Sequence, residues 1–346
     1  MSRTWIAVGA VGLFLVFAAV MGWLPLGAGP RCVADAAIEP AVRAKAQSFS
    51  KAFFEAVLRR DADTSYAMLS PGYQKVAPRE QFDAVLGALA ESGGGPFTKL
   101  APVAVYQVSR DRQPGRVICG NSETGVQVNA LSGAPQLHTL YEAQTPSHAW
   151  ALTAWLTPAA DTWQVLSFHV TISGIGGYDA AALQSLGQRE AGRGHAFNGY
   201  LLMSAASATA YRGPDFQPVI KPRIDAALAA MNVPAELSGE PPRVWRLGGR
   251  IYSVEQVTIV GADKQLGLVI QYRDPAWTLT DPDGEARNRA LIAAFVAAHP
   301  AWDQAFGFLV ARILRPGEGL VWGTVFDAKS GYAERPEAAD ASAPVP

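Results

Sequence analysis

The chain has 346 residues, of which 49% are hydrophobic and 17% are charged, and its formal net charge is −1. This composition is typical of a globular protein with ample apolar core, and the length allows about two domains. Nucleic-acid binding requires a basic patch, which this charge balance does not indicate. We therefore expect a globular protein without a nucleic-acid partner.

The first expected element is an uncharged apolar run over residues 5–24, preceded by Arg3. About 20 apolar residues are needed to cross a bilayer as a helix. Trp5 and Trp23 stand near the two ends, where membrane helices carry aromatic residues, and the positive-inside rule places Arg3 in the cytoplasm. We predict a single-pass inner-membrane anchor, with the rest of the chain in the periplasm.

A cleaved secretory signal is the alternative, because Ala34-Asp35-Ala36 resembles the small-residue pattern of a cleavage site. In that case the mature protein is secreted. Residues 25–40 are rich in Pro, Gly and Ala, which predicts a linker. Residues 1–40 are thus expected to be an anchor or signal followed by a linker.

The sequence contains two cysteines, Cys32 and Cys119. Export would permit a disulfide between them. Cys32 follows the membrane segment closely, whereas Cys119 lies in a short and mostly apolar run. On this placement the sequence favours two unpaired thiols, and a disulfide remains the alternative.

Residues 41–175 are predicted to form helices and then strands. Apolar residues at helical spacing indicate an amphipathic helix over 41–60. Shorter helices are expected over 62–69 and from Pro78 to Leu89, with Ser70-Pro71-Gly72 as the stop between them. The strand-like runs that follow are 104–109, 116–119, 126–131, 137–143, 148–156 and 163–172. Helices followed by antiparallel strands are typical of the α+β class.

Three segments of this region resemble the NTF2-like (cystatin-like cone) superfamily. They are Ala52-Phe-Phe-Glu-Ala-Val-Leu-Arg-Arg-Asp61, Tyr66-Ala-Met-Leu-Ser-Pro-Gly-Tyr73 and Trp163-Gln-Val-Leu-Ser-Phe-His-Val170. The resemblance implies helices packed on a curved antiparallel sheet, with a pocket on its concave face. It covers residues 41–175.

Residues 176–330 are predicted to form a second α+β domain, and residues 331–346 a disordered tail. Helices are expected from Asp179 to Gln188, over 195–211 and over 281–299, with strands over 243–247, 251–260, 266–272, 308–314 and 320–326.

Two segments of the chain have similar sequences, and we call this similarity the internal echo. Tyr73-Gln-Lys-Val76 followed by Pro78-Arg79 recurs as Phe216-Gln-Pro-Val219 followed by Pro222-Arg223. One interpretation is a tandem NTF2-like repeat. A separate small α+β domain is the other, because the helix expected over 281–299 interrupts the strands.

The sequence contains none of the G-x-S-x-G, H-E-x-x-H, C-x-x-C or P-loop motifs. We expect neither a metal nor a cofactor, and we assign no catalytic residue. The alternation along 163–172 places His169 on the strand face of Trp163, where the resemblance implies a pocket. The candidate ligand-binding residues are Tyr66, Tyr73, Trp155, Trp163 and His169.

These patterns favour a membrane-anchored periplasmic protein that binds an envelope protein partner or a small apolar ligand. The resemblance implies two alternatives. One is an isomerase- or cyclase-type enzyme with His169 as a general base in the cone. The other is a structural scaffold that forms a homodimer through its sheet.

Overall fold

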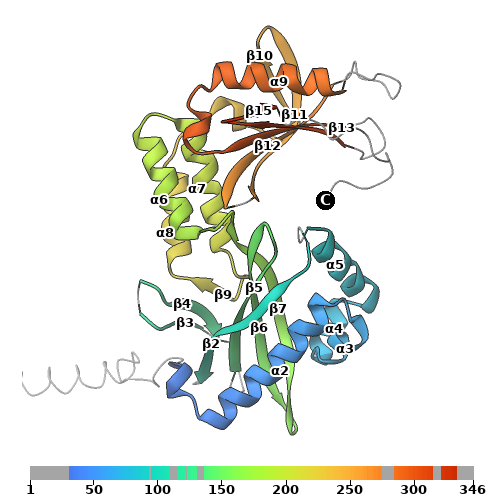
Figure 1. Ribbon diagram of the computed structural model, residues 1–346. Coiled ribbons are helices and arrows are strands. Elements are labelled where there is room, and N and C mark those ends of the chain that lie inside the picture. Colours follow the sequence, from blue (N-terminus) through green and yellow to red (C-terminus); the bar gives the residue numbers. More distant parts are fainter. Residues whose placement is uncertain are drawn as a thin grey trace, which may run out of the picture.

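The computed structural model describes residues 31–92, 95–109, 115–121, 123–130, 136–262, 264–274, 284–314 and 321–332. They form two helix-and-sheet units, one above the other in Figure 1. We call residues 31–179 the first half and residues 180–332 the second half. The predicted membrane span over 5–24 lies outside the described residues. Of the disordered tail predicted over 331–346, residues 331–332 instead form a short strand and the rest lies outside the described residues. Within the described residues, no helix has the length and apolar character needed to cross a bilayer.

The helices of the first half are α2 (Pro40–Leu58), α3 (Ala62–Ala67), α4 (Pro71–Val76) and α5 (Arg79–Ser92). Asp61 caps α3 by accepting a hydrogen bond from the Thr64 backbone N–H at 3.1 Å. Ser70 likewise caps α4 through the Tyr73 N–H. The predicted helices are confirmed, but Ser70 and Pro71 begin a further short helix, because Ser at the N-cap and Pro at the first helical position both favour a start.

The sheet of the first half is antiparallel throughout and has the strand order β1-β2-β5-β6-β7-β8. Its strands are β1 (Arg31–Ala34), β2 (Thr98–Ser109), β5 (Gln136–Gln144), β6 (His148–Ala159), β7 (Thr162–Ile175) and β8 (Tyr178–Asp179). The helices lie against one face of this curled sheet (Figure 1). The predicted α+β class with a curved antiparallel sheet is confirmed.

Aromatic side chains fill the space between these helices and the sheet. Phe53, Phe54 and Phe82 are almost completely buried. The ring of Phe168 on β7 lies 5.1 Å from that of Phe53 and 5.9 Å from that of Phe82. The concave face therefore holds a packed core, because edge-on aromatic contacts of this kind leave little free volume.

The start of the described chain corrects two predictions. Residues 31–37, predicted as part of a linker, form β1 and a short 3₁₀ turn, and Asp35 accepts a hydrogen bond from the Val105 N–H at 2.9 Å. Cys32 and Cys119, predicted as unpaired thiols, form a disulfide across a sequence separation of 87 residues. The prediction of unpaired thiols failed because disulfide formation depends on the position of the strand that carries Cys119. The local sequence around Cys119 does not indicate that this strand lies beside Cys32.

Cys119 belongs to a second, small sheet beside β1. It consists of β3 (Gly115–Cys119), β4 (Val126–Ala130) and β9 (Phe216–Pro218). Strand β9 comes from the second half and pairs with β4, so the two halves share this sheet. Phe216 is buried in its small core together with Val126 and Val128.

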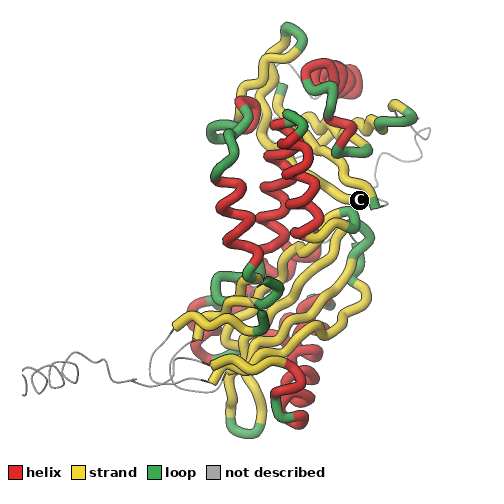
Figure 2. The backbone as a smooth tube through the Cα atoms, turned by 90° about the vertical axis from the view of Figure 1, so that its left-hand side faces the viewer, coloured by secondary structure: helices red, strands yellow, loops and turns green. Residues whose placement is uncertain are grey.

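In the second half, α6 (Ala180–Gly192), α7 (Ala196–Ala210) and α8 (Ile220–Ala229) stand between the two sheets (Figures 1 and 2). The second sheet has the order β10-β11-β12-β13-β14-β15. Its strands are β10 (Arg243–Leu247), β11 (Arg250–Ala262), β12 (Gln265–Arg273), β13 (Phe308–Leu314), β14 (Val321–Asp327) and β15 (Gly331–Tyr332). Helix α9 (Gly284–Ala298) connects β12 to β13, which are parallel.

The two sheets therefore differ in topology, because the first has only antiparallel pairs. The echoed segments agree only in part. Residues 73–76 lie in the helix α4, whereas residues 216–218 form the strand β9. At these positions the sequence echo does not correspond to a shared local structure. The second part of the echo is helical in both copies, since Arg79 begins α5 and Arg223 lies in α8.

Candidate functional site

The five predicted ligand-binding residues lie on both faces of the first sheet. Tyr66 and Tyr73 pack into the aromatic core on the helix-covered face. The Tyr66 ring is 5.5 Å from the Phe82 ring, and the Tyr73 ring is 5.9 Å from the Phe168 ring. Trp163 packs against the same core. These three residues pack on the helix-covered face and line none of the three cavities described below.

His169 and Trp155 lie on the opposite, outer face of the sheet. Trp155 pairs with Ser167 and Leu156 pairs with Val165, so Leu166 is an extra residue in β7. A bulge of this kind reverses the alternation of side chains beyond it. The expectation that His169 shares a face with Trp163 is therefore wrong.

A strap over residues 211–215, between α7 and β9, crosses this outer face. The Thr153 hydroxyl donates to the Arg212 carbonyl and the Thr171 hydroxyl donates to the Tyr211 carbonyl, both at 3.0 Å. Gly213 is buried directly over the His169 ring, since a Cβ at Gly213 would stand 2.8 Å from His169 Cγ. The strap thus covers His169.

Beneath the strap, His169 lies in a cluster with His138, Trp155, Phe216 and Asp215. Burial lowers the pKa of His138 to about 3. Burial also lowers the pKa of His169, with the nearby Asp215 carboxylate opposing the shift. The cavity among these side chains measures about 10 Å³, which is the space that one water molecule needs. A substrate has no room beside His169.

A larger groove lies where the two halves meet, and we call it the inter-half groove. Its volume is about 560 Å³, within the range of small-molecule sites, which often form between domains. It is lined from β6, β7, α7 and β11 by His148, Trp150, Val170, Thr171, Ile172, Ile175, Leu201, Ser204, Ala205, Ala208, Thr209, Tyr211, Val257, Thr258 and Ile259.

The described lining of the inter-half groove carries no Asp, Glu, Lys or Arg. Two of its hydroxyls already donate within the protein, Thr209 to the Ala205 carbonyl and Thr171 to the strap. His148 forms a hydrogen bond with the Ser147 hydroxyl at 2.8 Å, and burial lowers its pKa. Because burying a charge without a partner is costly, this surface favours a neutral and mostly apolar molecule.

Two glycines bring the halves together beside the inter-half groove. A Cβ at Gly261, near the end of β11, would stand 2.6 Å from Gly176 Cα and 2.7 Å from the Ser147 carbonyl oxygen. Gly176 follows β7 and has a φ of 56°. The backbones therefore touch directly, in a way that a larger residue at position 261 would prevent.

The sequence prediction missed the α7 and β11 walls of the groove. One signal was available, because residues 196–210 are rich in Ala and Leu around the whole helix. A helix that is apolar on all sides is normally buried on all sides, and α7 is buried between the two sheets. This apolar pattern predicts that α7 lies in a core, but it does not indicate which of its residues line the inter-half groove.

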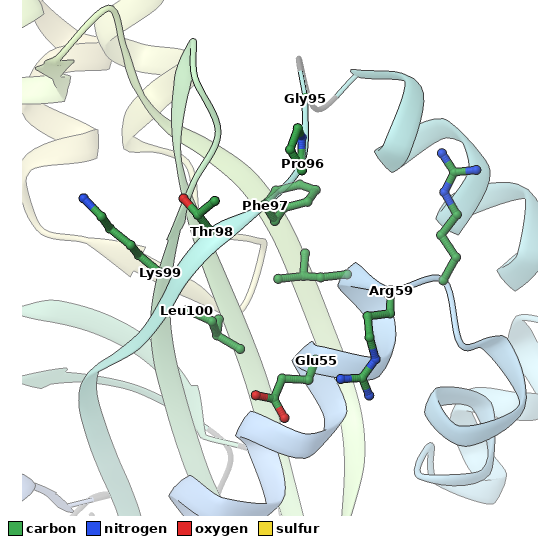
Figure 3. Close-up of a pocket in the computed structure, with 10 residues that line it drawn as sticks. Glu55, Arg59, Gly95, Pro96, Phe97, Thr98, Lys99 and Leu100 are labelled. Carbon is green, nitrogen blue, oxygen red and sulfur yellow. The ribbon is translucent and has the colours of Figure 1, made fainter.

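A second groove, of about 490 Å³, lies between the C-terminal end of α2 and the beginning of β2, and we call it the α2–β2 groove (Figure 3). Its lining residues are Glu55, Leu58, Arg59, Arg60, Gly95, Pro96, Phe97, Thr98, Lys99 and Leu100. The Phe97 ring lies 5.3 Å from that of Trp150, which lines the inter-half groove. One aromatic pair therefore stands between the two grooves.

Within the described residues, no group of three or more His, Cys, Asp or Glu side chains is arranged to hold a metal ion. Comparison of the chain with family models, curated proteins and solved structures gives no match. The geometry of the two grooves is therefore the basis on which a function can be assigned.

Proposed function

We propose that this chain is an envelope binding protein, anchored in the inner membrane by residues 5–24, that holds a small neutral apolar molecule in the inter-half groove. The observation that carries the proposal is this groove of about 560 Å³ with no charged residue in its described lining. Sites for small molecules are typically apolar clefts of this size with a few polar groups that orient the ligand.

The disulfide supports the part of the proposal that concerns export. Cys32 and Cys119 are paired, and structural disulfides persist mainly in oxidising compartments such as the periplasm. The apolar run over 5–24 precedes this disulfide closely in the chain. Both features suit a protein whose body lies outside the cytoplasm.

The curved sheet with helices on one face supports the NTF2-like resemblance, but the resemblance would place the ligand in the cone. Aromatic packing around Phe168 occupies that face. We therefore assign the ligand to the inter-half groove instead.

Native mass spectrometry of the full chain, purified from an exporting host and released from detergent micelles, tests the proposal. We expect a retained small molecule on the wild type. Replacing Ala205, a half-buried residue of the groove wall, by Phe should fill the groove and abolish the extra mass. The matched control is Ala181→Phe on the exposed side of α6. Equal retention by Ala205→Phe and the control, or no ligand on any form, would contradict the proposal.

A further inference from the structure

We infer that the α2–β2 groove is a second binding site, selective for a small amphipathic monoanion: a carboxylate on an alkyl chain. This inference does not depend on the proposed function, because it concerns a different groove with a different lining. It rests on an apolar floor, on positively charged side chains that form no ion pair among the described residues, and on backbone conformations held at the groove.

The floor of the α2–β2 groove is apolar. Phe97, just before β2, and Leu100, on β2, extend toward the end of α2 (Figure 3), and Leu58 contributes from the helix. Leu58, Phe97 and Leu100 are each only partly buried, and all three pack against the core of the first half. An alkyl chain placed here would cover apolar surface that the described residues leave open to water, which stabilises binding by about 25 cal/mol per Å² buried.

The rim of the groove is positively charged. Arg59, Arg60 and Lys99 line it, and within the described residues none of them forms an ion pair. The one carboxylate of the described lining, Glu55, is paired with Lys51. The pKa of Asp61, next to Arg60 in the chain, is lowered by hydrogen bonds from Thr64 and further by Arg59. Arg79, by contrast, forms ion pairs with both Asp63 and Asp83.

Figure 3 shows how these charges are distributed. Arg59 lies at the end of α2 on the same side as Glu55, whereas Lys99 extends to the other side of β2. Arg59 therefore supplies positive charge on the helix side, and the next residue, Arg60, also lines the groove. An anionic head group at this end would complement them, because guanidinium groups bind carboxylates with directed hydrogen bonds.

Two lining residues have a backbone conformation that glycine adopts more easily. The φ angle is 59° at Arg60 and 54° at Lys99. Arg60 follows the end of α2, where a left-handed residue is usually Gly. An arginine at such a position does not stabilise the turn as a glycine would. Strained residues of this type occur preferentially at functional sites. The strain is consistent with a role for the Arg60 side chain.

The two grooves thus differ in the charge of the ligand they would accept, although the Phe97 ring of one lies against the Trp150 ring of the other. A matched pair of probes can distinguish them: decanoic acid carrying a photoreactive diazirine, and the corresponding decanol. The carboxylate is ionised at neutral pH. The probes are applied to the full chain in nanodiscs of phosphatidylcholine, and the labelled residues are mapped by peptide mass spectrometry.

We expect the acid probe to label residues 55–60 and 95–100, and the alcohol not to label them. The double substitution Arg59→Gln with Arg60→Gln should reduce acid labelling by roughly three- to tenfold, the range that two exposed charges provide. Raising the ionic strength should reduce labelling of the wild type by a similar factor. The control is Arg246→Gln with Arg250→Gln in the second half, which removes the same charge and should leave labelling unchanged.

Three results would overturn the inference. Acid labelling could survive the Arg59 and Arg60 substitutions in a folded protein, it could be insensitive to salt, or the alcohol could label residues 95–100 equally. Labelling of the inter-half groove by the alcohol is scored separately on residues 201–211 and bears only on the proposed function.

Discussion

Gly213 shows how a single residue determines what His169 can do. The strap backbone lies on the imidazole ring because Gly213 has no side chain, and its φ of 119° is open to glycine almost alone. The ring is thereby shielded from solvent, and burial lowers its pKa. A histidine that would be a natural candidate for acid–base chemistry is instead part of a packing contact.

Replacing Gly213 by Ala should therefore destabilise the protein. The new Cβ would stand 2.8 Å from His169 Cγ and 2.9 Å from Nε2, and the backbone would be strained as well. The two effects together should lower the free energy of unfolding by roughly 2–4 kcal/mol. Urea denaturation followed by circular dichroism measures this difference.

A double-mutant cycle separates the two effects. Adding His169→Ala to Gly213→Ala should restore the part of the stability lost through the ring contact, while the backbone strain remains. Strictly additive losses for the two substitutions would show that the strap does not rest on His169.

At the level of single elements, the sequence predicts most helices and strands, but it does not predict on which face of a strand each side chain lies. The amphipathic pattern over 41–60 gives α2, and the alternation over 163–172 gives β7. The extra residue Leu166 is not visible as a pattern, because a bulge inserts one residue without changing the apolar content. That one residue moves His169 to the outer face and separates the predicted site.

The disulfide could not be predicted from the local sequence either, because it depends on where the strands lie relative to each other. It fastens β1 to β3, and neither strand belongs to a long regular pattern. Replacing both Cys32 and Cys119 by Ser should destabilise the protein by about 4.6 kcal/mol, the value expected for a closed loop of this length. Thermal melts of the two forms without reductant measure the difference.

Reductant provides the internal control for this prediction. Dithiothreitol should lower the melting temperature of the wild type toward that of the double serine form, and should leave the double serine form unchanged. A wild type that melts at the same temperature with and without reductant, although mass spectrometry confirms reduction, would contradict the prediction.

At the scale of the whole molecule, the inter-half groove exists because α7 and the two sheets meet without filling the space between them. The sequence predicts the strand β11 and the helix α7 separately. The approach of β11 to the first half depends on the contact between Gly176 and Gly261, which are distant in sequence and carry no local signal for it. The groove could therefore not be predicted from periodicity or motifs.

Gly261→Ala should push the two halves apart at this contact. The added methyl group would meet backbone atoms of Gly176 and Ser147, which cannot rotate away as a side chain could. We expect at least a tenfold loss of any ligand bound in the inter-half groove, which corresponds to about 1.4 kcal/mol. Isothermal titration with decanol as the probe measures the change.

The matched control is Gly192→Ala in α6, where an added Cβ meets no atom within 4 Å. This variant should bind decanol like the wild type and should be equally or slightly more stable, because Ala favours a helix over Gly. Equal affinity in the two variants would show that the glycine contact does not set the shape of the groove.

Because β9 belongs to the second half of the chain, the small sheet is completed late during synthesis. The chain emerges N-terminus first, so β3 and β4 are complete long before Phe216 can join them. Until then Val126 and Val128 lack the aromatic ring that covers them in the small core. The first half therefore cannot finish folding as an independent early unit, and its last corner closes only after α7 has been made. A gene split between the two sheets would give a fragment with an open strand edge on β4.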